Sequence, residues 1–349
     1  MTAEFQAMIG VATRWRFELG VVTVIAAIMA AGFLGGAQHE LDDAQLHLTS
    51  RQASGELVIV EIDAKSLAAL DTWPWPRGTH AELIAKLVAV DAKLIAMDVD
   101  FSSPSTPGED AKLAQAIAAS GGRVVLPSFM QHTHSGRDAT LIERRPLAVV
   151  AEQALVGNAN VFAPDGKARN SSLGLFLPNG EFRPTFAALI GQRGQSNVND
   201  FGVDFSIDPS TIPRFSYADV LSGSFDVKGI QGKRVIVGAT AIELGDRVPV
   251  PKYGIIAGVE FQALVAESIL QGRMLTSFGM AGAMLLVVLL VAVMRPGTTS
   301  WSFRSFGLRP SICTAAVVTI PLLANNFAVG VVETAPAIAA LILSAVTSL

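Results

Sequence analysis

The sequence predicts a membrane-anchored α/β protein: an extracytoplasmic, mostly parallel sheet with flanking helices, an antiparallel hairpin region, and about four transmembrane helices. Three observations lead to this fold class. The mean hydropathy of +0.45, with only 16% charged residues, is too high for an ordinary soluble enzyme. Four long runs of residues carry no charge. Between the first two runs, apolar strands alternate with amphipathic helices, an order that demands a parallel sheet.

The four apolar runs predict transmembrane helices. Residues 19–37 and 275–294 are each long enough to cross roughly 30 Å of hydrocarbon as a helix. A third run covers residues 311–332. The fourth covers residues 334–349 and is short for a span, so we expect it to be truncated. For the first run a cleaved signal peptide is the alternative, because a basic flank and small residues are also typical of signal sequences.

The charges beside the runs predict how the chain is oriented. Arg14 and Arg16 precede the first run, and the loop 295–310 holds three arginines. Because cationic flanks stay cytoplasmic, residues 1–18 and this loop are expected inside the cell. Residues 38–274 are therefore expected outside, and the lipid bilayer is a predicted partner.

The outside domain begins with a predicted polar helix that leaves the membrane and ends near Ser54. A β-α-β-α-β order follows, and the helices have the apolar spacing that covers one face of a sheet. Its strands are expected at residues 57–63, 93–101 and 123–129, and its helices at 80–90 and 111–120.

From residue 157 the pattern becomes antiparallel. The turn dipeptides Asp165-Gly166 and Asn179-Gly180 lie between short segments, which is typical of hairpins, and a helix is expected from Pro184. A short helix at 216–223, a buried strand at 232–240 and a helix at 259–270 complete the domain.

Several classes of partner and chemistry find no support. The only cysteine, Cys313, lies in the third apolar run, so the outside domain has no disulfide. The net charge of −4 argues against nucleic acid. His132 and His134 are loop residues without metal-ligand spacing, so no metal is predicted.

No catalytic residue or cofactor is predicted either. Residues 238–247 lack the glycine spacing of a nucleotide loop, and no hydrolase, zinc-protease or kinase motif occurs. We interpret 238–247 as a tight turn near the first strand.

The stretch WPWPRGTH, residues 73–80, follows the first strand, at the end of a parallel sheet where such sheets bind ligands. Its prolines hold Trp73 and Trp75 on a stiff frame. These tryptophans could form a wall for a small ligand or a partner, with Arg77 as a clamp for an anion or carboxylate. The structural alternative is that they cap the open end of the sheet while Arg77 pairs with a neighbouring acid.

Acidic residues follow the predicted strands. They are Asp63, Asp98, Asp100 and Asp246. Because the carboxyl ends of parallel strands meet at one edge, we expect a cluster of carboxylates beside Arg77. Such a cluster can bind a ligand amine, bind a metal, or form a structural ion-pair network. Together with Trp73, Trp75 and Arg77, these four acids are the candidate ligand-binding residues.

A set of motifs runs in order from about residue 38 to residue 275: VIVEIDAKSLAAL, WPWPR, LIAMDVDFSSPS, GNANVFAPDGKAR, SYADVLSG, GKRVIVGATAIELGDR and GVEFQALVAESIL. This set resembles the second type of the CHASE domain, the cyclase- and histidine-kinase-associated sensory extracellular domain (CHASE-two). Members look like bacterial receptors with one span, the outside sensor, usually three more spans, and a cytoplasmic kinase or cyclase. The resemblance implies an inner-membrane location, a sensor in the periplasm or extracellular space, and a homodimer. This sequence departs from the pattern because it lacks the output module.

The resemblance implies the sensor and membrane part of a bacterial signal-transduction receptor. Its outside domain would detect an external stimulus, an unknown small molecule or an envelope ligand, and move transmembrane helices to control a kinase or cyclase. One alternative is an envelope scaffolding protein without signalling output. Another is an extracytoplasmic hydrolase that uses Asp63, Asp98 and Asp246. Whether the whole protein is an enzyme depends on the missing module.

Overall fold

The computed structural model describes residues 19–71, 73–133, 140–191, 198, 200–294, 312–320, 323–324 and 330–348. The chain divides into two compact units, which are described separately. The α/β unit is Thr49–Met274, and the helical unit is Met1–Leu48 with Leu275–Leu349. His134 and the arginines of the predicted cytoplasmic segments 1–18 and 295–310 lie outside the described residues.

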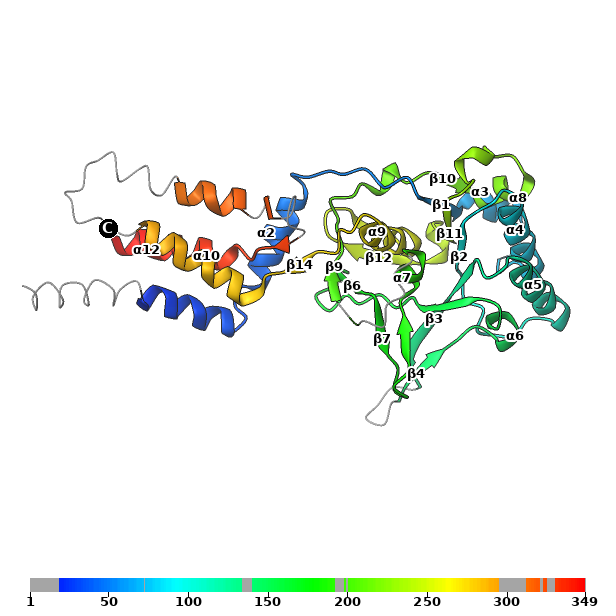
Figure 1. Cartoon of the computed structure of the whole chain (residues 1–349), viewed down its shortest axis with the longest axis horizontal. Coiled ribbons are helices and arrows are strands. Elements are labelled where there is room, and N and C mark those ends of the chain that lie inside the picture. Colours follow the sequence, from blue (N-terminus) through cyan, green and yellow to red (C-terminus); the bar gives the residue numbers. More distant parts are fainter. Residues whose placement is uncertain are drawn as a thin grey trace, which may run out of the picture. The chain divides into compact units, whose positions relative to one another are not determined.

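The α/β unit contains a seven-stranded sheet in the order β10-β1-β11-β2-β3-β4, with β5 also paired to β3 (Figure 1). Every pair is parallel except β3 with β4, so the predicted mostly parallel sheet is confirmed. The strands are β1 (Leu57–Ile62), β2 (Leu94–Asp98), β3 (Val124–His132), β4 (Leu141–Arg144), β5 (Leu155–Asn158), β10 (Arg214–Ser216) and β11 (Arg234–Ala239).

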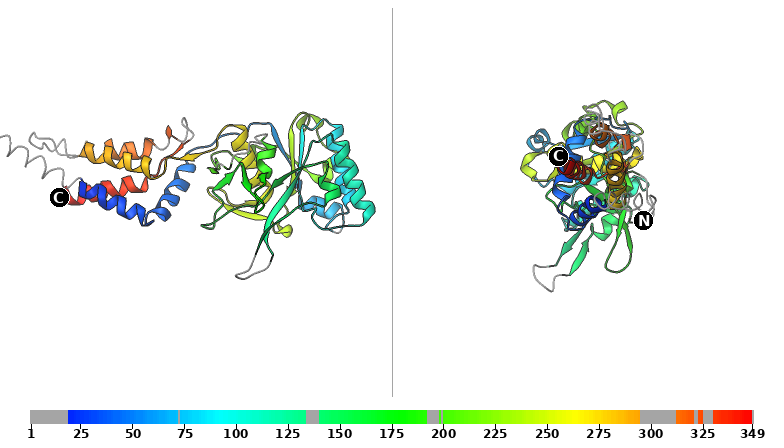
Figure 2. Two further views of the ribbon diagram at one scale, coloured as in Figure 1. Left: turned by 60° about the horizontal axis from the view of Figure 1, so that its bottom comes forward. Right: turned by 90° about the vertical axis from the view of Figure 1, so that its left-hand side faces the viewer.

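Helices cover both faces of this sheet (Figure 2). On one face Leu83 and Leu87 pack with Val58 and Val60 in a single apolar core. Because β1 is buried on both sides, its sequence is an almost continuous apolar run. The first face carries α3 (Ala64–Ala69), α4 (Arg77–Ala89), α5 (Pro107–Ala119), α6 (Ala148–Ala151) and α8 (Tyr217–Ser222); the other carries α7 (Phe186–Ile190) and α9 (Gly258–Leu270).

The predicted antiparallel region is present as short hairpins. The turn Asn179-Gly180 joins β7 (Gly174–Phe176) to β8 (Phe182–Pro184), and Gly180 has a φ of 82° that favours glycine. Two further antiparallel pairs are β6 (Asn170–Ser172) with β9 (Asp200–Gly202), and β12 (Arg247–Val250) with β13 (Gly254–Ala257). Short 3₁₀ helices are η1 (Pro209–Thr211), η2 (Val227–Gly229) and η3 (Ile242–Leu244).

Several boundaries differ from the prediction, mostly because side chains cap the helices. The helix expected from residue 111 begins at Pro107, since the Thr106 hydroxyl caps it. The helix expected from Pro184 begins at Phe186, capped by Thr185. Asp63 caps α3, a helix that the sequence pattern did not predict. The strands β4, β5 and β10 were also not predicted; they have three or four residues each and show little periodicity.

The helical unit packs apolar helices around one cluster that includes Ile25, Val287, Cys313 and Ala337. Its helices are Leu19–Ala30, α2 (Gly35–Leu46), α10 (Gly279–Met294), the segment 312–320, and α12 (Ala335–Ser348). The short strands β14 (Thr276–Ser277) and β15 (Gly330–Val331) pair in parallel.

The first apolar run is not one straight helix. The helices Leu19–Ala30 and α2 meet at a bend of 90°, next to Gly32 with a φ of 75°. The predicted polar helix ends at Leu46, before the expected Ser54. Among the described residues no single helix has both the length and the apolar character to cross a membrane, although the bent pair meets both criteria when taken together. The four spans therefore stay a prediction.

Candidate functional site

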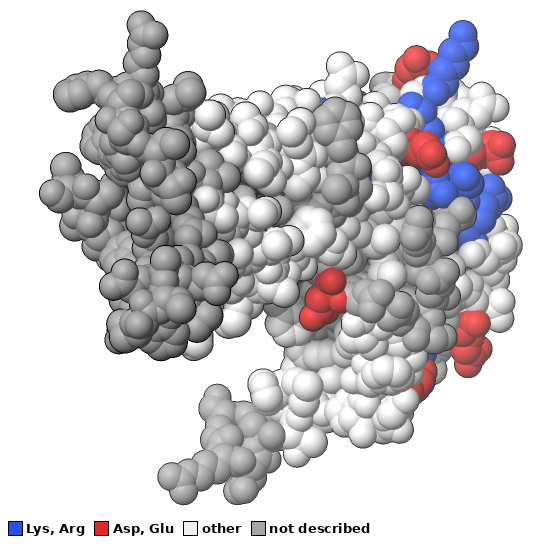
Figure 3. Space-filling model, turned by 60° about the vertical axis from the view of Figure 1, so that its left-hand side comes forward, with Lys and Arg blue, Asp and Glu red and all other residues white. Residues whose placement is uncertain are grey.

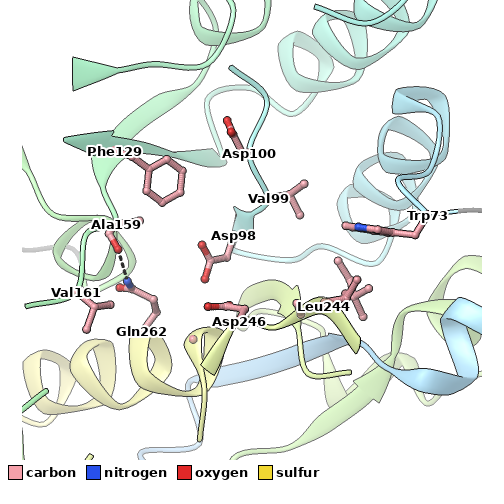
Figure 4. A pocket seen from close by; sticks show the side chains of 13 residues that line it. Trp73, Asp98, Val99, Asp100, Phe129, Ala159, Val161, Leu244, Asp246 and Gln262 are labelled. Carbon is pink, nitrogen blue, oxygen red and sulfur yellow. Dashed lines mark hydrogen bonds between the residues drawn. The ribbon is translucent and has the colours of Figure 1, made fainter. Parts of the chain in front are cut away.

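A pocket of about 350 Å³ lies at the carboxyl ends of the central strands (Figure 4). Ile62, Asp98 and Ala239 line it from the ends of β1, β2 and β11, and Phe129 lines it from β3. Open α/β sheets bind ligands at this edge, because the loops that leave parallel strands diverge there. The remaining lining residues are Trp73, Val99, Asp100, Ala159, Val161, Leu244, Asp246, Gly258 and Gln262.

Two carboxyl groups, of Asp98 and Asp246, lie next to each other in the pocket (Figure 4). Neither accepts a hydrogen bond from any described residue. Burial, and then the negative charge of Asp246, raise the pKa of Asp98 to about 7. Partial burial also raises the pKa of Asp246, and the nearby Arg247 opposes that rise. Among the described residues, no cation forms an ion pair or a hydrogen bond with this acidic pair.

Small residues make room for this pair. A Cβ atom on Gly258, the first residue of α9, would overlap both carboxylate oxygens of Asp246. A Cβ atom on Gly238 would come within 2.7 Å of the Val259 side chain and 3.2 Å of the Asp98 Cβ. The expected close passage of the segment after β11 by the first strand is present, since the Thr240 amide donates to the Ile62 carbonyl at 3.1 Å. The glycines thus let β11, α9 and the two acids approach one another.

Gln262 supplies a neutral polar group on the pocket wall. Its side chain is buried, and its Nε2 donates a hydrogen bond to the Ala159 carbonyl at 3.1 Å. Its Oε1 accepts no hydrogen bond from the described part of the chain. Because Gln262 lines the pocket, this oxygen is available to a ligand donor.

Four of the seven residues predicted for ligand binding meet at this pocket: Trp73, Asp98, Asp100 and Asp246. Asp100 lies at the exposed rim, and its Oδ1 accepts a hydrogen bond from the Ser102 amide at 2.8 Å. Trp73 is partly buried and forms the end of the pocket near Leu244 (Figure 4).

The other three predicted residues have partners within the protein. Asp63 accepts hydrogen bonds from the Ser66 amide at 2.8 Å and from the Ser216 hydroxyl at 3.0 Å. The Arg77 Nε lies 3.2 Å from Asp110 Oδ1, and the guanidinium also donates to the Ser103 carbonyl. This ion pair corresponds to the structural alternative for Arg77.

Trp75 belongs to a buried aromatic group behind the pocket. It is 4% exposed, and its ring centroid lies 4.7 Å from that of Tyr217. The Tyr217 hydroxyl lies 3.0 Å from His80 Nδ1, and burial lowers the pKa of His80 to about 4. The peptide bond between Trp73 and Pro74 is cis. Trp73 therefore lines the pocket, whereas Trp75, two positions later in the same loop, packs in the core.

Nine of the 13 lining residues have no counterpart in the sequence prediction, among them Phe129, Gly258 and Gln262. Gln262 had a detectable signal, because it is polar within an otherwise apolar helix face. Phe129 had no such signal, since aromatic residues are common in strands. Within the described residues, no group of three His, Cys, Asp or Glu side chains is arranged to hold a metal ion.

The chain was compared with known families and proteins. A family model described as the CHASE2 domain matches residues 21–294, which is more than half of the chain. No curated protein matches the chain. No solved structure matches it either.

Proposed function

Because the chain belongs to the CHASE2 domain family, the extracellular sensory domains of signalling receptors, we propose that its α/β unit senses an external small molecule in the pocket that contains Asp98 and Asp246. The observation that carries the proposal is the position of α9. This helix begins at the pocket, where Gly258 and Gln262 line the wall, and ends near the residues that leave the α/β unit.

The carboxyl end of α9 is fastened to the segment by which the chain enters the unit. Glu267 is fully buried, and its carboxylate accepts hydrogen bonds from the Ser54 amide at 2.8 Å and the Ser54 hydroxyl at 2.9 Å. The Gln271 side chain donates to the Gln52 carbonyl at 3.2 Å. A displacement of α9 is therefore expected to move residues 52–54.

The same end of α9 is fastened to the segment by which the chain leaves. Arg273 follows the helix and pairs with the buried Asp204, whose amide donates to the Ser268 hydroxyl at 3.0 Å. Over 13 residues α9 extends about 20 Å, and it is rigid enough to carry a small shift from the pocket to this end. A ligand changes the equilibrium between two positions of α9 only by its difference in affinity for them, typically about 1–3 kcal/mol.

We place the helical unit in a bilayer. Leu285, Leu289 and Ile342 are more than half exposed although they lie on helices of strongly apolar composition. Figure 3 shows one face of the whole chain, on which residues other than Lys, Arg, Asp and Glu, apolar and uncharged polar alike, make up most of the described surface. Large exposed apolar surfaces are typical of contact with lipid or with another protein. We propose four spans in a bacterial inner membrane, from the four apolar runs and the family, with the α/β unit in the periplasm or outside the cell, an orientation that the flanking arginines favour.

The output of this receptor is proposed to be a cytoplasmic histidine kinase or a nucleotide or diguanylate cyclase. A homodimer is part of the same proposal, because such outputs work in pairs. The alternative, an envelope scaffold without signalling output, shares the membrane anchoring but needs no ligand in the pocket.

Cysteine labelling in intact cells tests the orientation on which sensing depends. In a Cys313→Ser background, Lys228→Cys places a thiol at an exposed position of the α/β unit, and Ser300→Cys places one in the predicted cytoplasmic loop. A membrane-impermeant maleimide is expected to label Lys228→Cys in intact cells and Ser300→Cys only after permeabilisation. The reverse pattern would exclude an external sensor.

A further inference from the structure

We propose that the pocket binds a small organic cation, with an ammonium group beside Asp98 and Asp246 and a short apolar body against Trp73 and Phe129. This inference names the ligand class of the pocket and so rests on the proposed sensory function.

The charges of the pocket favour a cation. Three of its 13 lining residues are acids, and none is Lys, Arg or His. Two arginines that do not line the pocket have hydrogen-bond partners of their own: Arg247 donates to the Thr240 carbonyl at 2.8 Å, and Arg144 donates to the Ser102 hydroxyl at 2.6 Å. An anion would therefore be repelled by the two carboxylates, whereas a cation would compensate their charge, which Arg247 offsets only in part.

The acidic pair is poorly solvated when the pocket is empty. Burial and the neighbouring Asp246 both disfavour the ionised form of Asp98, so that its pKa lies at about 7. A bound ammonium group would reverse both effects, since an opposite charge within hydrogen-bond distance favours the ionised carboxylate. Binding of a cation and ionisation of Asp98 are thus coupled.

The polar groups fit an ammonium ion better than a metal. An ammonium group has three N–H donors, and three residues of the wall present acceptors: Asp98, Asp246 and the Oε1 of the buried Gln262. Gln262 already uses its amide NH₂ on the Ala159 carbonyl, so its oxygen is the group left for a donor. A metal ion would need more carboxylate, His or Cys ligands in one place than the described residues provide.

The rest of the wall suits an apolar body. Ile62, Val99, Val161 and Leu244 are aliphatic, and the rings of Trp73 and Phe129 add aromatic surface. Aromatic faces attract cations as well as apolar groups. A volume of about 350 Å³ lies at the small end of the range for ligand pockets, so the occupant has few heavy atoms.

The test measures binding to the full chain in lipid nanodiscs by calorimetry. The probes are propylamine, isopentylamine and benzylamine, each compared with the alcohol of the same carbon skeleton. We expect saturable binding of at least one amine and at least about tenfold weaker binding of its alcohol, because the alcohol lacks the charge-assisted bonds. No saturable binding by any amine, or equal binding of amine and alcohol, would overturn the inference.

Two variants locate the binding. Asp98→Asn removes the charge at nearly constant shape and is expected to weaken amine binding at least about tenfold. Asp226→Asn removes an equal charge at an exposed position outside the pocket lining, where the Asn oxygen can still accept the Lys228 amide, and is expected to change affinity by less than about threefold. Equal effects of both variants would contradict the assignment to the acidic pair.

The wild-type protein provides a measurement that needs no variant. The charged groups near Asp98 are Asp246 and, beside Asp246, Arg247; Asp100 lies at the rim with its carboxylate turned away from Asp98 (Figure 4). Since the pKa of Asp98 lies at about 7, amine affinity is expected to rise between about pH 6 and about pH 8, while the amines themselves stay protonated. A flat profile would overturn the inference.

The labelling experiment and the binding experiment can fail separately. If labelling places the α/β unit outside and no amine binds, only the proposed ligand class is wrong. If amines bind and labelling places the unit inside, only the proposed sensory function is wrong.

Discussion

Arg273 donates a hydrogen bond from Nε to Oδ2 of Asp204 at 2.7 Å, and Asp204 is fully buried. The Nε of Arg51 lies 4.0 Å from the same oxygen. Arg51 belongs to the segment by which the chain enters the α/β unit, and Arg273 to the segment by which it leaves. One carboxylate therefore connects two segments that are more than 200 residues apart in sequence, at the end of α9 remote from the pocket.

Asp204→Asn should destabilise the protein by about 3–5 kcal/mol, because it leaves the buried guanidinium of Arg273 without its counter-charge. Urea unfolding of the full chain in detergent measures the change. The control is Asp219→Asn, which breaks the exposed Lys65–Asp219 pair and should cost less than about 1 kcal/mol. Similar losses in both variants would show that Asp204 has no special structural role.

Trp75→Ala should cost about 3–5 kcal/mol, since Trp75 is 4% exposed and packs in the core with Tyr217. Trp73→Ala should cost only about 1–2 kcal/mol, because the Trp73 ring is partly exposed at the pocket. The shift of the urea midpoint gives both values. A larger loss for Trp73 would mean that the two rings have been assigned the wrong roles.

Gly258→Ala should leave α9 folded but displace the Asp246 carboxylate, with which an added Cβ would overlap. Amine affinity is then expected to fall while helix content by circular dichroism stays unchanged. Gly108→Ala in α5 is the matched control: its Cβ would meet no atom within 4 Å, so stability should stay equal or rise by up to about 1 kcal/mol. Unchanged amine affinity in Gly258→Ala would show that Asp246 takes no part in binding.

Asp98→Asn should stabilise the unliganded protein at pH 8 and have little effect near pH 4. The folded-state pKa of about 7 lies above the unfolded value of 3.8, so the folded protein retains a proton that the unfolded chain loses. Stability is therefore lost as the pH rises from about 4 to about 7, by up to about 1.4 kcal/mol per pH unit, and the loss is complete above pH 7. Asn does not titrate, so the Asp98→Asn variant does not lose this stability as the pH rises.

Thermal melting of wild type and Asp98→Asn across this pH range measures the effect, with Asp100→Asn as the control of equal charge. The curves of wild type and Asp98→Asn should converge near pH 4, diverge as the pH rises from about 4 to about 7, and keep a constant separation above about pH 7. A constant separation at all pH values would instead indicate a packing difference between the two side chains.

Much of the scaffold could be predicted because the relevant signals are local. The apolar runs of β1, β2 and β11 depend only on burial of both sheet faces, and the Asn179-Gly180 turn depends on two residues. The starts of helices were predicted less accurately. Those of α5 and α7 are set by single hydrogen bonds to the hydroxyl groups of Thr106 and Thr185. Short strands such as β10 were missed, since three residues have no measurable period.

The sequence alone therefore determined the order of the main strands and helices, the parallel sheet, and the edge of the sheet at which acids would gather. These features depend on the spacing of apolar residues and on the alternation of strands with helices, and both can be recognised from residues that are close together in the sequence. Only the tertiary structure decided which acids face the pocket. Asp63 turns into the cap of α3, whereas Asp98 and Asp246, 148 positions apart, meet because β11 lies beside β2 and Gly258 leaves room for a carboxylate. Such proximity depends on contacts between distant segments, and no local pattern records it.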